Sequence, residues 1–282
     1  MLIENKRFDE ERALYGLTNV KVRGCRFEGP ADGESALKEC SLLEATDCFF
    51  DLRYPFWHVT GAVIDKCNMT ENCRAALWYD ENIEIRSSTI HGIKALRECR
   101  DIKIDDCDII SPEFLWRCSD VEILKSQITS EYPFFESKNL SMKEIKLKGK
   151  YSFQYVENAT ITDSVLDTKD AFWHSKNVTV KNCLVKGEYL GWYSENLKLI
   201  DCIIIGTQPL CYCKGLVLEN CTTEDTDLSF EYSEVNATVK GKIESIKNPV
   251  RGYIKADEIG EIIFDSPRVD ENNTVIEIGK HR

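Results

Sequence analysis

The chain has 282 residues and a formal net charge of −12 at pH 7. This acidic balance argues against nucleic-acid binding, because contacts to phosphates need a basic surface. No apolar run is long enough to span a bilayer, so a membrane is not expected as a partner either. Hydrophobic residues make up 43% of the chain, which is ample for a packed core.

Residues 1–18 are charged at their start and contain no apolar secretory segment, so we expect a cytoplasmic protein. Leu2, Phe8, Leu14 and Leu17 are apolar positions among these charges. An open end of a repetitive β structure would expose a sheet edge. We therefore interpret residues 1–18 as an amino-terminal cap.

A seven-residue block recurs along the chain, as in Asn177–Cys183 and Asn196–Cys202, which lie 19 residues apart. A fixed period of this length is typical of a solenoid, which forms one continuous domain. The seventh position of the block is usually small: Cys25, Cys48, Cys67, Ser88, Cys107, Ser126, Ile145, Ser164, Cys183, Cys202 and Cys221. The period is broken by insertions at residues 28–35 and 69–74, and insertions in solenoids often mark the binding face.

Each block alternates apolar and polar residues, as at Val178 and Val180, which predicts a strand with one buried face. Asn, Asp or Gly at the head of the block suits a left-handed backbone bend on every turn. Short strands separated by bends predict an all-β fold, a right-handed parallel β-helix of about eleven or twelve turns. We expect it to span residues 1–242, followed by a carboxy-terminal β cap at 243–282 in the same domain.

Three features together resemble a known family. They are the Ala-Leu-Tyr-Gly-Leu opening at Ala13–Leu17, the Asn-Val-x-Val-x-x-Cys blocks, and the ending around Asn248–Phe264. The sequence resembles an uncharacterised bacterial family of pectin-lyase-like, single-stranded right-handed β-helix proteins. The resemblance covers essentially the whole chain and implies the fold, but it implies no activity.

Thirteen cysteines are distributed mainly over two columns of equivalent positions on successive turns. Seven occupy the small position of the block, and Cys40, Cys99, Cys118 and Cys213 share a second column with Ser137, Val156, Ser175 and Ser194. Exchange with serine and valine indicates buried small positions, and a cytoplasmic setting favours free thiols over disulfides. A metal site is the weaker alternative because these columns contain no histidine. We expect neither a metal nor a cofactor.

An aromatic column lies four residues before each Asn bend, and it contains all five tryptophans. Its members are Tyr15, Lys38, Trp57, Trp78, Arg97, Trp116, Phe135, Gln154, Trp173, Trp192 and Cys211. Strand alternation from the inward column before it predicts that these side chains point outward. The following column adds histidine, tyrosine and charged residues. We take eleven residues of the two columns as candidate ligand contacts: Trp57, His58, Trp78, Tyr79, Arg97, Trp116, Arg117, Trp173, His174, Trp192 and Tyr193.

No segment matches the clustered aspartates or the Gly-His-Gly segment of pectin-lyase-like enzymes. The best acid–base candidates are His174, Asp170, Glu136 and Arg117, which the repeat places on nearby turns. Whether the protein is an enzyme stays open. If it is one, it would act like a polysaccharide lyase or a glycoside hydrolase.

Two hypotheses about function follow from the aromatic columns. In the first, aromatic rings and planar polar groups hold an oligosaccharide, and the protein binds or modifies carbohydrate. In the second, it is a non-enzymatic scaffold that self-associates, as a homodimer for example, through the same residues. The rings would also stabilise the fold by stacking between turns without any ligand.

Overall fold

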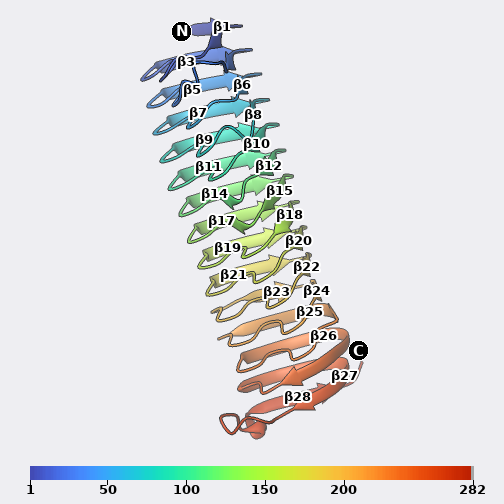
Figure 1. Ribbon diagram of the computed structural model, residues 1–282. Coiled ribbons are helices and arrows are strands. Elements are labelled where there is room, and N and C mark those ends of the chain that lie inside the picture. The colour runs from blue at the N-terminus through green and yellow to red at the C-terminus, as the bar shows by residue number, and fades with distance from the viewer. Residues whose placement is uncertain (281–282) are drawn as a thin grey trace. The chain divides into compact units, whose positions relative to one another are not determined.

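The computed structural model describes residues 1–280 and contains two compact units, Met1–Ser141 (unit 1) and Met142 onward (unit 2). Within each unit, strands from successive turns pair in parallel and in register, so equivalent residues lie one above another (Figure 1). The only helix among the described residues is one 3-10 turn, η1 (Glu271–Asn273). The predicted all-β parallel β-helix is confirmed.

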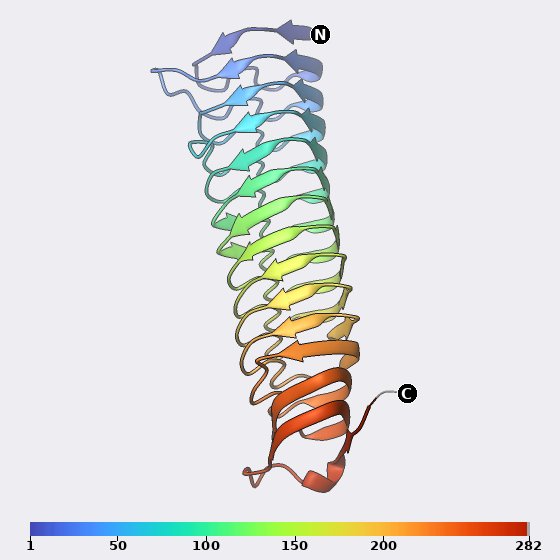
Figure 2. The ribbon, with the colours of Figure 1, turned by 90° about the vertical axis from the view of Figure 1, so that its right-hand side faces the viewer.

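Unit 1 repeats a longer strand, a bend and a shorter strand. The longer strands are β1 (Leu2–Glu4), β3 (Thr18–Arg23), β5 (Ser41–Thr46), β7 (Thr60–Asp65), β9 (Glu81–Arg86), β11 (Arg100–Asp105) and β14 (Ser119–Leu124). The shorter ones are β2 (Arg7–Phe8), β4 (Arg26–Phe27), β6 (Phe49–Phe50), β8 (Asn68–Met69), β10 (Thr89–His91), β12 (Asp108–Ile110) and β15 (Gln127–Ser130). A further pair, β13 (Glu113–Phe114) and β16 (Tyr132–Pro133), forms a small sheet of its own. Figure 2 shows the arrows of successive longer strands pointing the same way.

Unit 2 follows the same plan, and β17 (Lys138–Lys143) contains the boundary between the units. Its longer strands are β19 (Glu157–Thr162), β21 (Lys176–Lys181), β23 (Lys198–Ile200), β25 (Leu216–Glu224), β26 (Glu234–Lys247), β27 (Arg251–Ile263) and β28 (Thr274–Ile278). The shorter strands are β18 (Lys146–Gly149), β20 (Val165–Asp167), β22 (Leu184–Lys186) and β24 (Ile203–Ile205).

The two segments interpreted as caps carry parallel strands as well. In residues 1–18, β1 pairs with β3 and β2 pairs with β4. Toward the carboxyl end, the ladder continues from β26 through β27 to β28, and β27 is one long strand. The longer strands number about fifteen in the described residues, so the predicted eleven or twelve turns is too low.

Apolar residues of the strands fill the interior of each unit at one-turn intervals. In unit 1 the rings of Phe27 and Phe50 stack with centroids 4.6 Å apart, and in unit 2 Phe153 and Phe172 stack at 4.9 Å. All four side chains are fully buried. Such columns of like residues give each turn a similar apolar cross-section.

The predicted left-handed bends are present at the head of the block. Asn82 and Asn177 have φ of 58° and 53°. In unit 2 the Asn177 side chain donates from Nδ2 to Asn158 Oδ1 at 3.1 Å, and Asn196 Nδ2 donates to Asn177 Oδ1 at 2.9 Å. These side-chain bonds link successive turns where the bend would otherwise expose polar groups.

Candidate functional site

The aromatic columns lie on a bend of the backbone and not on a strand. At Leu77 and Tyr79 φ is 59° and 62°, while Trp78 between them has an ordinary negative φ. The same alternation recurs at Phe172 and His174, on either side of Trp173. The bend keeps its hydrogen bonds, since the Tyr79 N–H donates to the Arg97 carbonyl at 2.9 Å on the next turn. This local geometry decides where the rings point.

The tryptophans are half-buried, whereas Leu77 and Phe172 in the preceding column are fully buried, so the indoles lie at the outer side of the core and are partly covered. Each indole N–H donates to a backbone carbonyl on the next turn. The Trp78 Nε1 bond to Lys94 O is 2.6 Å, and the Trp173 Nε1 bond to Tyr189 O is 2.7 Å. Equivalent bonds join Trp57 to Ala75, Trp116 to Tyr132 and Trp192 to Gln208. The polar edge of each indole is thus already satisfied within the protein.

The faces of these rings are covered as well. Trp57 stacks on Trp78 with centroids 5.1 Å apart and planes 5° from parallel. In unit 2, Trp173 stacks on Trp192 at 5.4 Å and 4°. A sugar ring that binds to an aromatic side chain needs an open ring face, and these faces contact each other instead.

Arg97 takes the place of a ring in the indole column of unit 1. Its guanidinium carbon lies 4.8 Å from the ring centroids of both Trp78 and Trp116, so it is sandwiched between two indoles. Its terminal nitrogen also donates to Glu113 Oε2 at 2.8 Å, and both side chains are largely shielded from solvent. Arg97 is therefore engaged inside the column and is not free to bind an acidic ligand.

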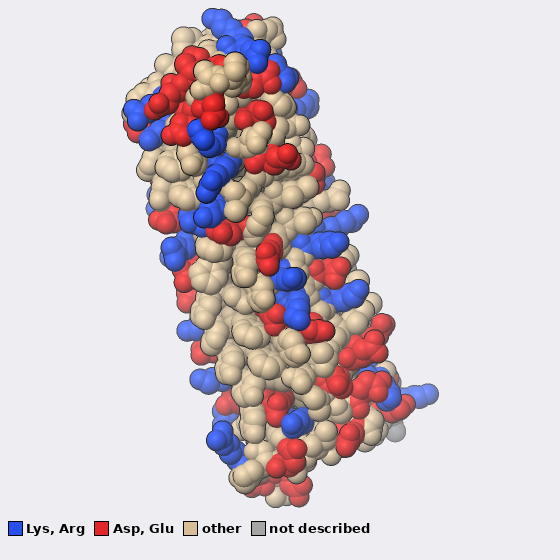
Figure 3. All heavy atoms as spheres, viewed as in Figure 1, with Lys and Arg blue, Asp and Glu red and all other residues tan. Residues whose placement is uncertain are grey.

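The column that follows the indoles is the exposed one. In unit 1, His58 stacks on Tyr79 at 4.9 Å, and Arg117 pairs with Glu136 through a 2.6 Å bond from Nε to Oε2. Figure 3 shows basic and acidic side chains intermingled on the face it displays, in keeping with such pairs between adjacent turns.

In unit 2 this column becomes an unbroken stack of five rings, which we call the exposed ladder: Tyr155, His174, Tyr193, Tyr212 and Tyr232. Successive centroids lie 4.9, 5.0, 4.8 and 5.5 Å apart. Tyr155 and Tyr193 are 47% and 43% exposed, so these two side chains face solvent in part while each ring stacks on His174. Burial raises the pKa of the Tyr212 phenol above its ordinary value.

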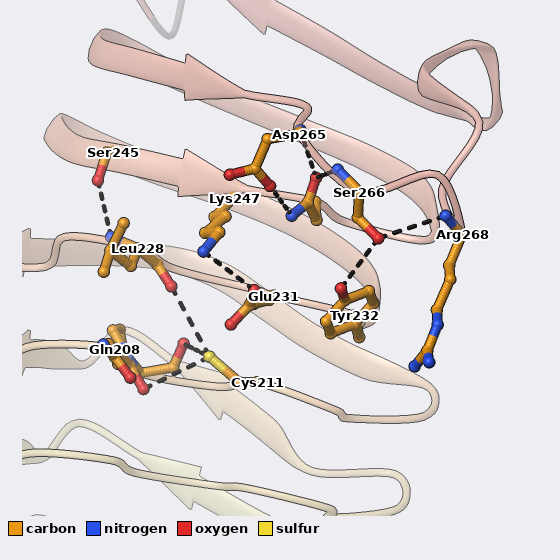
Figure 4. A network of polar contacts seen from close by, with 12 residues as sticks. Gln208, Cys211, Leu228, Glu231, Tyr232, Ser245, Lys247, Asp265, Ser266 and Arg268 are labelled. Atoms are coloured by element: carbon orange, nitrogen blue, oxygen red, sulfur yellow. Dashed lines mark hydrogen bonds and ion pairs between the residues drawn. The ribbon is translucent and has the colours of Figure 1, made fainter.

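The last ring of the exposed ladder is held by the loop before β28. The Tyr232 hydroxyl bonds to Ser266 Oγ at 2.9 Å, and Asn248 fixes the same loop by donating to Asp265 Oδ1 at 2.7 Å (Figure 4). Beside it, Lys247 Nζ lies 3.3 Å from Glu231 Oε1. Sequence reasoning missed Tyr232 because the 19-residue period degrades after Cys221. Tyr232 follows Tyr212 by 20 residues, close to the period of 19, and this spacing could have placed it in the same column.

Within neither unit do the acid–base candidates pair as a catalytic acid and base. In unit 1, Arg117 and Glu136 neutralise each other. In unit 2, His174 is stacked between Tyr155 and Tyr193 and makes no hydrogen bond to Asp170. Burial raises the pKa of the Asp170 carboxyl. Among the described residues, no three His, Cys, Asp or Glu side chains are grouped so as to hold a metal ion.

A buried carboxyl that the sequence reasoning missed lies in the second cysteine column. Asp80 is 1% exposed, and its Oδ1 accepts the Val59 N–H at 2.8 Å, while its Oδ2 is buried without a hydrogen-bond partner. Burial raises the pKa of this carboxyl well above its usual range. Its position between Val59 and Cys99 in the column was the signal that could have revealed it.

All thirteen cysteines are free and buried, as the column pattern predicted. Burial raises the pKa of Cys73 to about 12 and of Cys107 to about 11, so these thiols are protonated and unreactive at neutral pH. We expect an aromatic disulfide reagent to label no thiol in the native protein and thirteen after denaturation in guanidinium. The absorbance of the thiolate released from the reagent measures the number of labelled thiols. Fast labelling of the native protein would contradict the burial of these columns.

Residues 1–277 match the family described as "Protein of unknown function (DUF3737)". The chain belongs to this family. The match agrees with the resemblance noted in the sequence, and the β-helix of both units agrees with the fold that the resemblance implied. A search of curated protein sequences gave no significant match.

Several solved structures are similar to this chain at low identity. The A-module of mannuronan C-5 epimerase AlgE4 from Azotobacter vinelandii is 9% identical, with 95% of this chain and 88% of that chain covered and a TM-score of 0.30. The tailspike protein of E. coli bacteriophage HK620, in complex with a hexasaccharide, is 11% identical over 99% and 67%, with a TM-score of 0.42. The periplasmic alginate epimerase AlgG is 9% identical over 98% and 73%, with a TM-score of 0.29. These neighbours include carbohydrate-active proteins, but nothing about the activity of this chain follows from likeness at this level.

Among residues 1–280, no helix has the length and apolar character needed to cross a membrane.

Proposed function

We propose that this protein is a non-catalytic interaction protein that associates with a second copy of itself through the exposed ladder of unit 2. The observation that carries the proposal is the stack of five rings from Tyr155 to Tyr232, whose faces contact each other and of which Tyr155, His174 and Tyr193 are exposed. Tyrosine is enriched where proteins contact each other. Because stacking already orders these rings, little side-chain entropy is lost when a partner docks.

The charges beside the exposed ladder support a self-complementary contact. Two residues further along each turn lies a column of alternating sign: Glu157, Lys176, Glu195, Lys214 and Glu234. A second copy that runs antiparallel and is offset by one turn would place each positive charge opposite a negative one. Such pairing favours one register of association over the others.

Sedimentation velocity over a concentration series tests the proposal. We expect the wild type to show a faster, concentration-dependent species, and Tyr193→Arg to stay monomeric. Arg97 shows that a guanidinium can replace a ring within a stack of this protein, so the variant should fold. With the copies offset by one turn, the two added charges would lie one turn apart across the two-fold contact and repel.

The control is Val165→Arg, which adds the same charge at an exposed position on β20, outside the exposed ladder. It should associate like the wild type. A wild type that stays monomeric at every concentration would overturn the proposal, and so would a Tyr193→Arg variant that associates normally.

Carbohydrate binding is the second candidate, and one observation favours it. The phenols of Tyr193 and Tyr212 lie on successive turns and could hydrogen-bond to a glycan that lies along the ring edges without ring stacking. Tyr193→Arg and its control Val165→Arg also distinguish carbohydrate binding from self-association. If a monomeric wild type binds an oligosaccharide on a glycan array and Tyr193→Arg does not, carbohydrate binding replaces self-association.

A further inference from the structure

The two insertions that break the 19-residue period lie around one hollow in unit 1, which we call the insertion groove. Its volume is about 430 Å³. The first insertion contributes Gly29 and Asp32, the second contributes Glu71, Asn72 and Arg74, and the other lining residues are Asp51, Leu52, Arg53 and Ile93. The convergence of both insertions on one hollow is what a binding face built onto a solenoid would produce.

Two arginines lie on adjacent turns at this groove. The Tyr54 N–H donates to the Arg74 carbonyl at 3.0 Å, which places Arg53 and Arg74 on adjacent turns. Like charges on neighbouring strands destabilise each other unless an anion neutralises them. Arg53 has such partners, because its terminal nitrogen lies 3.1 Å from Asp32 Oδ2 and its Nε lies 3.6 Å from Glu34 Oε2.

Both guanidiniums retain unused hydrogen-bonding capacity. The 3.6 Å between Arg53 Nε and Glu34 Oε2 is too long for a hydrogen bond, so Arg53 Nε is buried without a hydrogen-bond partner. The exposed Arg74 side chain makes no ion pair with any residue from 1 to 280. Two donor groups at adjacent turns can together bind the oxygens of a single anion, since guanidinium binds carboxylate and phosphate with paired N–H donors.

The rest of the groove is suited to hydroxyl groups. Asp51 Oδ1 accepts from Thr70 Oγ1 and from Asn72 Nδ2, the latter at 3.1 Å, which fixes the carboxylate and leaves Oδ2 for another donor. Glu71 is exposed and adds further acceptor oxygens. Ile93 is 36% exposed and offers a small apolar contact beside them. Carboxylates that would repel a simple anion are useful for a ligand that also carries hydroxyl donors.

We propose that the insertion groove binds a small, hydroxyl-bearing oxyanion, in which Arg53 and Arg74 hold a carboxylate or phosphate group and Asp51 and Glu71 accept from the hydroxyls. The groove falls within the range of volumes typical of small-molecule sites. The proposal does not depend on self-association, because the groove is formed by unit 1 alone and the exposed ladder belongs to unit 2.

Isothermal titration calorimetry with four probes tests it: gluconate, glucose 6-phosphate, glucose and inorganic phosphate. We expect binding of gluconate or glucose 6-phosphate and much weaker binding of glucose and of inorganic phosphate. The preferred anionic probe tells whether the group held by the arginines is a carboxylate or a phosphate. The full chain is used throughout.

Arg74→Gln should weaken binding of the preferred probe by about tenfold or more, because a charge-assisted contact is lost. Arg100→Gln is the matched control, since Arg100 is an exposed arginine of unit 1 that pairs with Glu81 outside the groove. It should bind like the wild type. The proposal fails if no probe binds, if glucose or inorganic phosphate binds as tightly as the two hydroxyl-bearing anions, or if Arg74→Gln and Arg100→Gln behave alike.

Discussion

Replacing Asp80 with serine is expected to stabilise the protein by about 1–3 kcal/mol, the range found for removing a buried polar group that lacks a partner. Serine is the natural occupant of this column at other turns. Ser137 accepts the Cys118 N–H at 3.0 Å and donates to the Leu115 carbonyl at 2.8 Å. A serine at position 80 can make the equivalent bonds, whereas Asp80 leaves its Oδ2 unpaired. Urea denaturation measures the difference as a shift in midpoint.

The advantage of Asp80→Ser should grow as the pH rises. Burial raises the pKa of Asp80 in the folded protein, so the unfolded chain loses this proton first, near pH 4. Above that pH the unfolded state binds fewer protons than the folded state, and the free energy of unfolding falls as pH rises toward the folded pKa. The slope for one proton is about 1.4 kcal/mol per pH unit.

Asp80→Asn is the control for this pH effect, because it keeps the shape of the side chain and removes the ionisation. Unfolding free energies of wild type, Asp80→Ser and Asp80→Asn should be compared from pH 4 to pH 9. The difference between wild type and either variant should widen above pH 4 and level off once the pH passes the folded pKa of Asp80. A constant difference across this range would show that Asp80 ionises in the folded protein as readily as in the unfolded chain.

The repeat made most of the fold predictable, because it assigns every residue to a column. The Asn bends, the buried small positions and the free thiols all follow from columns that a reader can align by eye. Asp80 shows the limit of that approach. Its column was recognised by small residues, and a carboxyl among them was passed over although the spacing to Cys99 is the regular 19 residues.

The geometry of the aromatic columns could not be predicted from strand alternation. The bend at Leu77–Tyr79 uses left-handed φ at residues that are neither Asn nor Gly, and residue type gives no warning of this. The spacing between turns then decides whether the rings contact each other. Rings repeated at about 5 Å contact each other directly, as Trp57 and Trp78 do, and no space is left for a sugar between them. The candidate site therefore moves from the indoles to the exposed ladder.

The largest loss of stability is expected for Gly187→Ala. Gly187 lies at the second bend of its turn with φ of 151°, and a Cβ there would lie 1.4 Å from the carbonyl oxygen of Thr168. The clash involves backbone, so one turn must move away from the other. That would stretch the bond from the Thr168 N–H to the Lys186 carbonyl, now 2.8 Å, which joins these two turns. We expect a cost of about 3 kcal/mol or more.

Gly241→Ala separates this steric clash from the general penalty of alanine at positive φ. Gly241 also lies in unit 2, with φ of 83°, and a Cβ there would meet no atom within 4 Å. Its cost should be about 1 kcal/mol, the strain of a left-handed alanine alone. Urea midpoints for both variants give the comparison. Equal losses would mean that the turns at this bend lie farther apart than the Gly187 contact indicates. A much larger loss at Gly187 would show that close backbone approach, more than backbone conformation, requires glycine there.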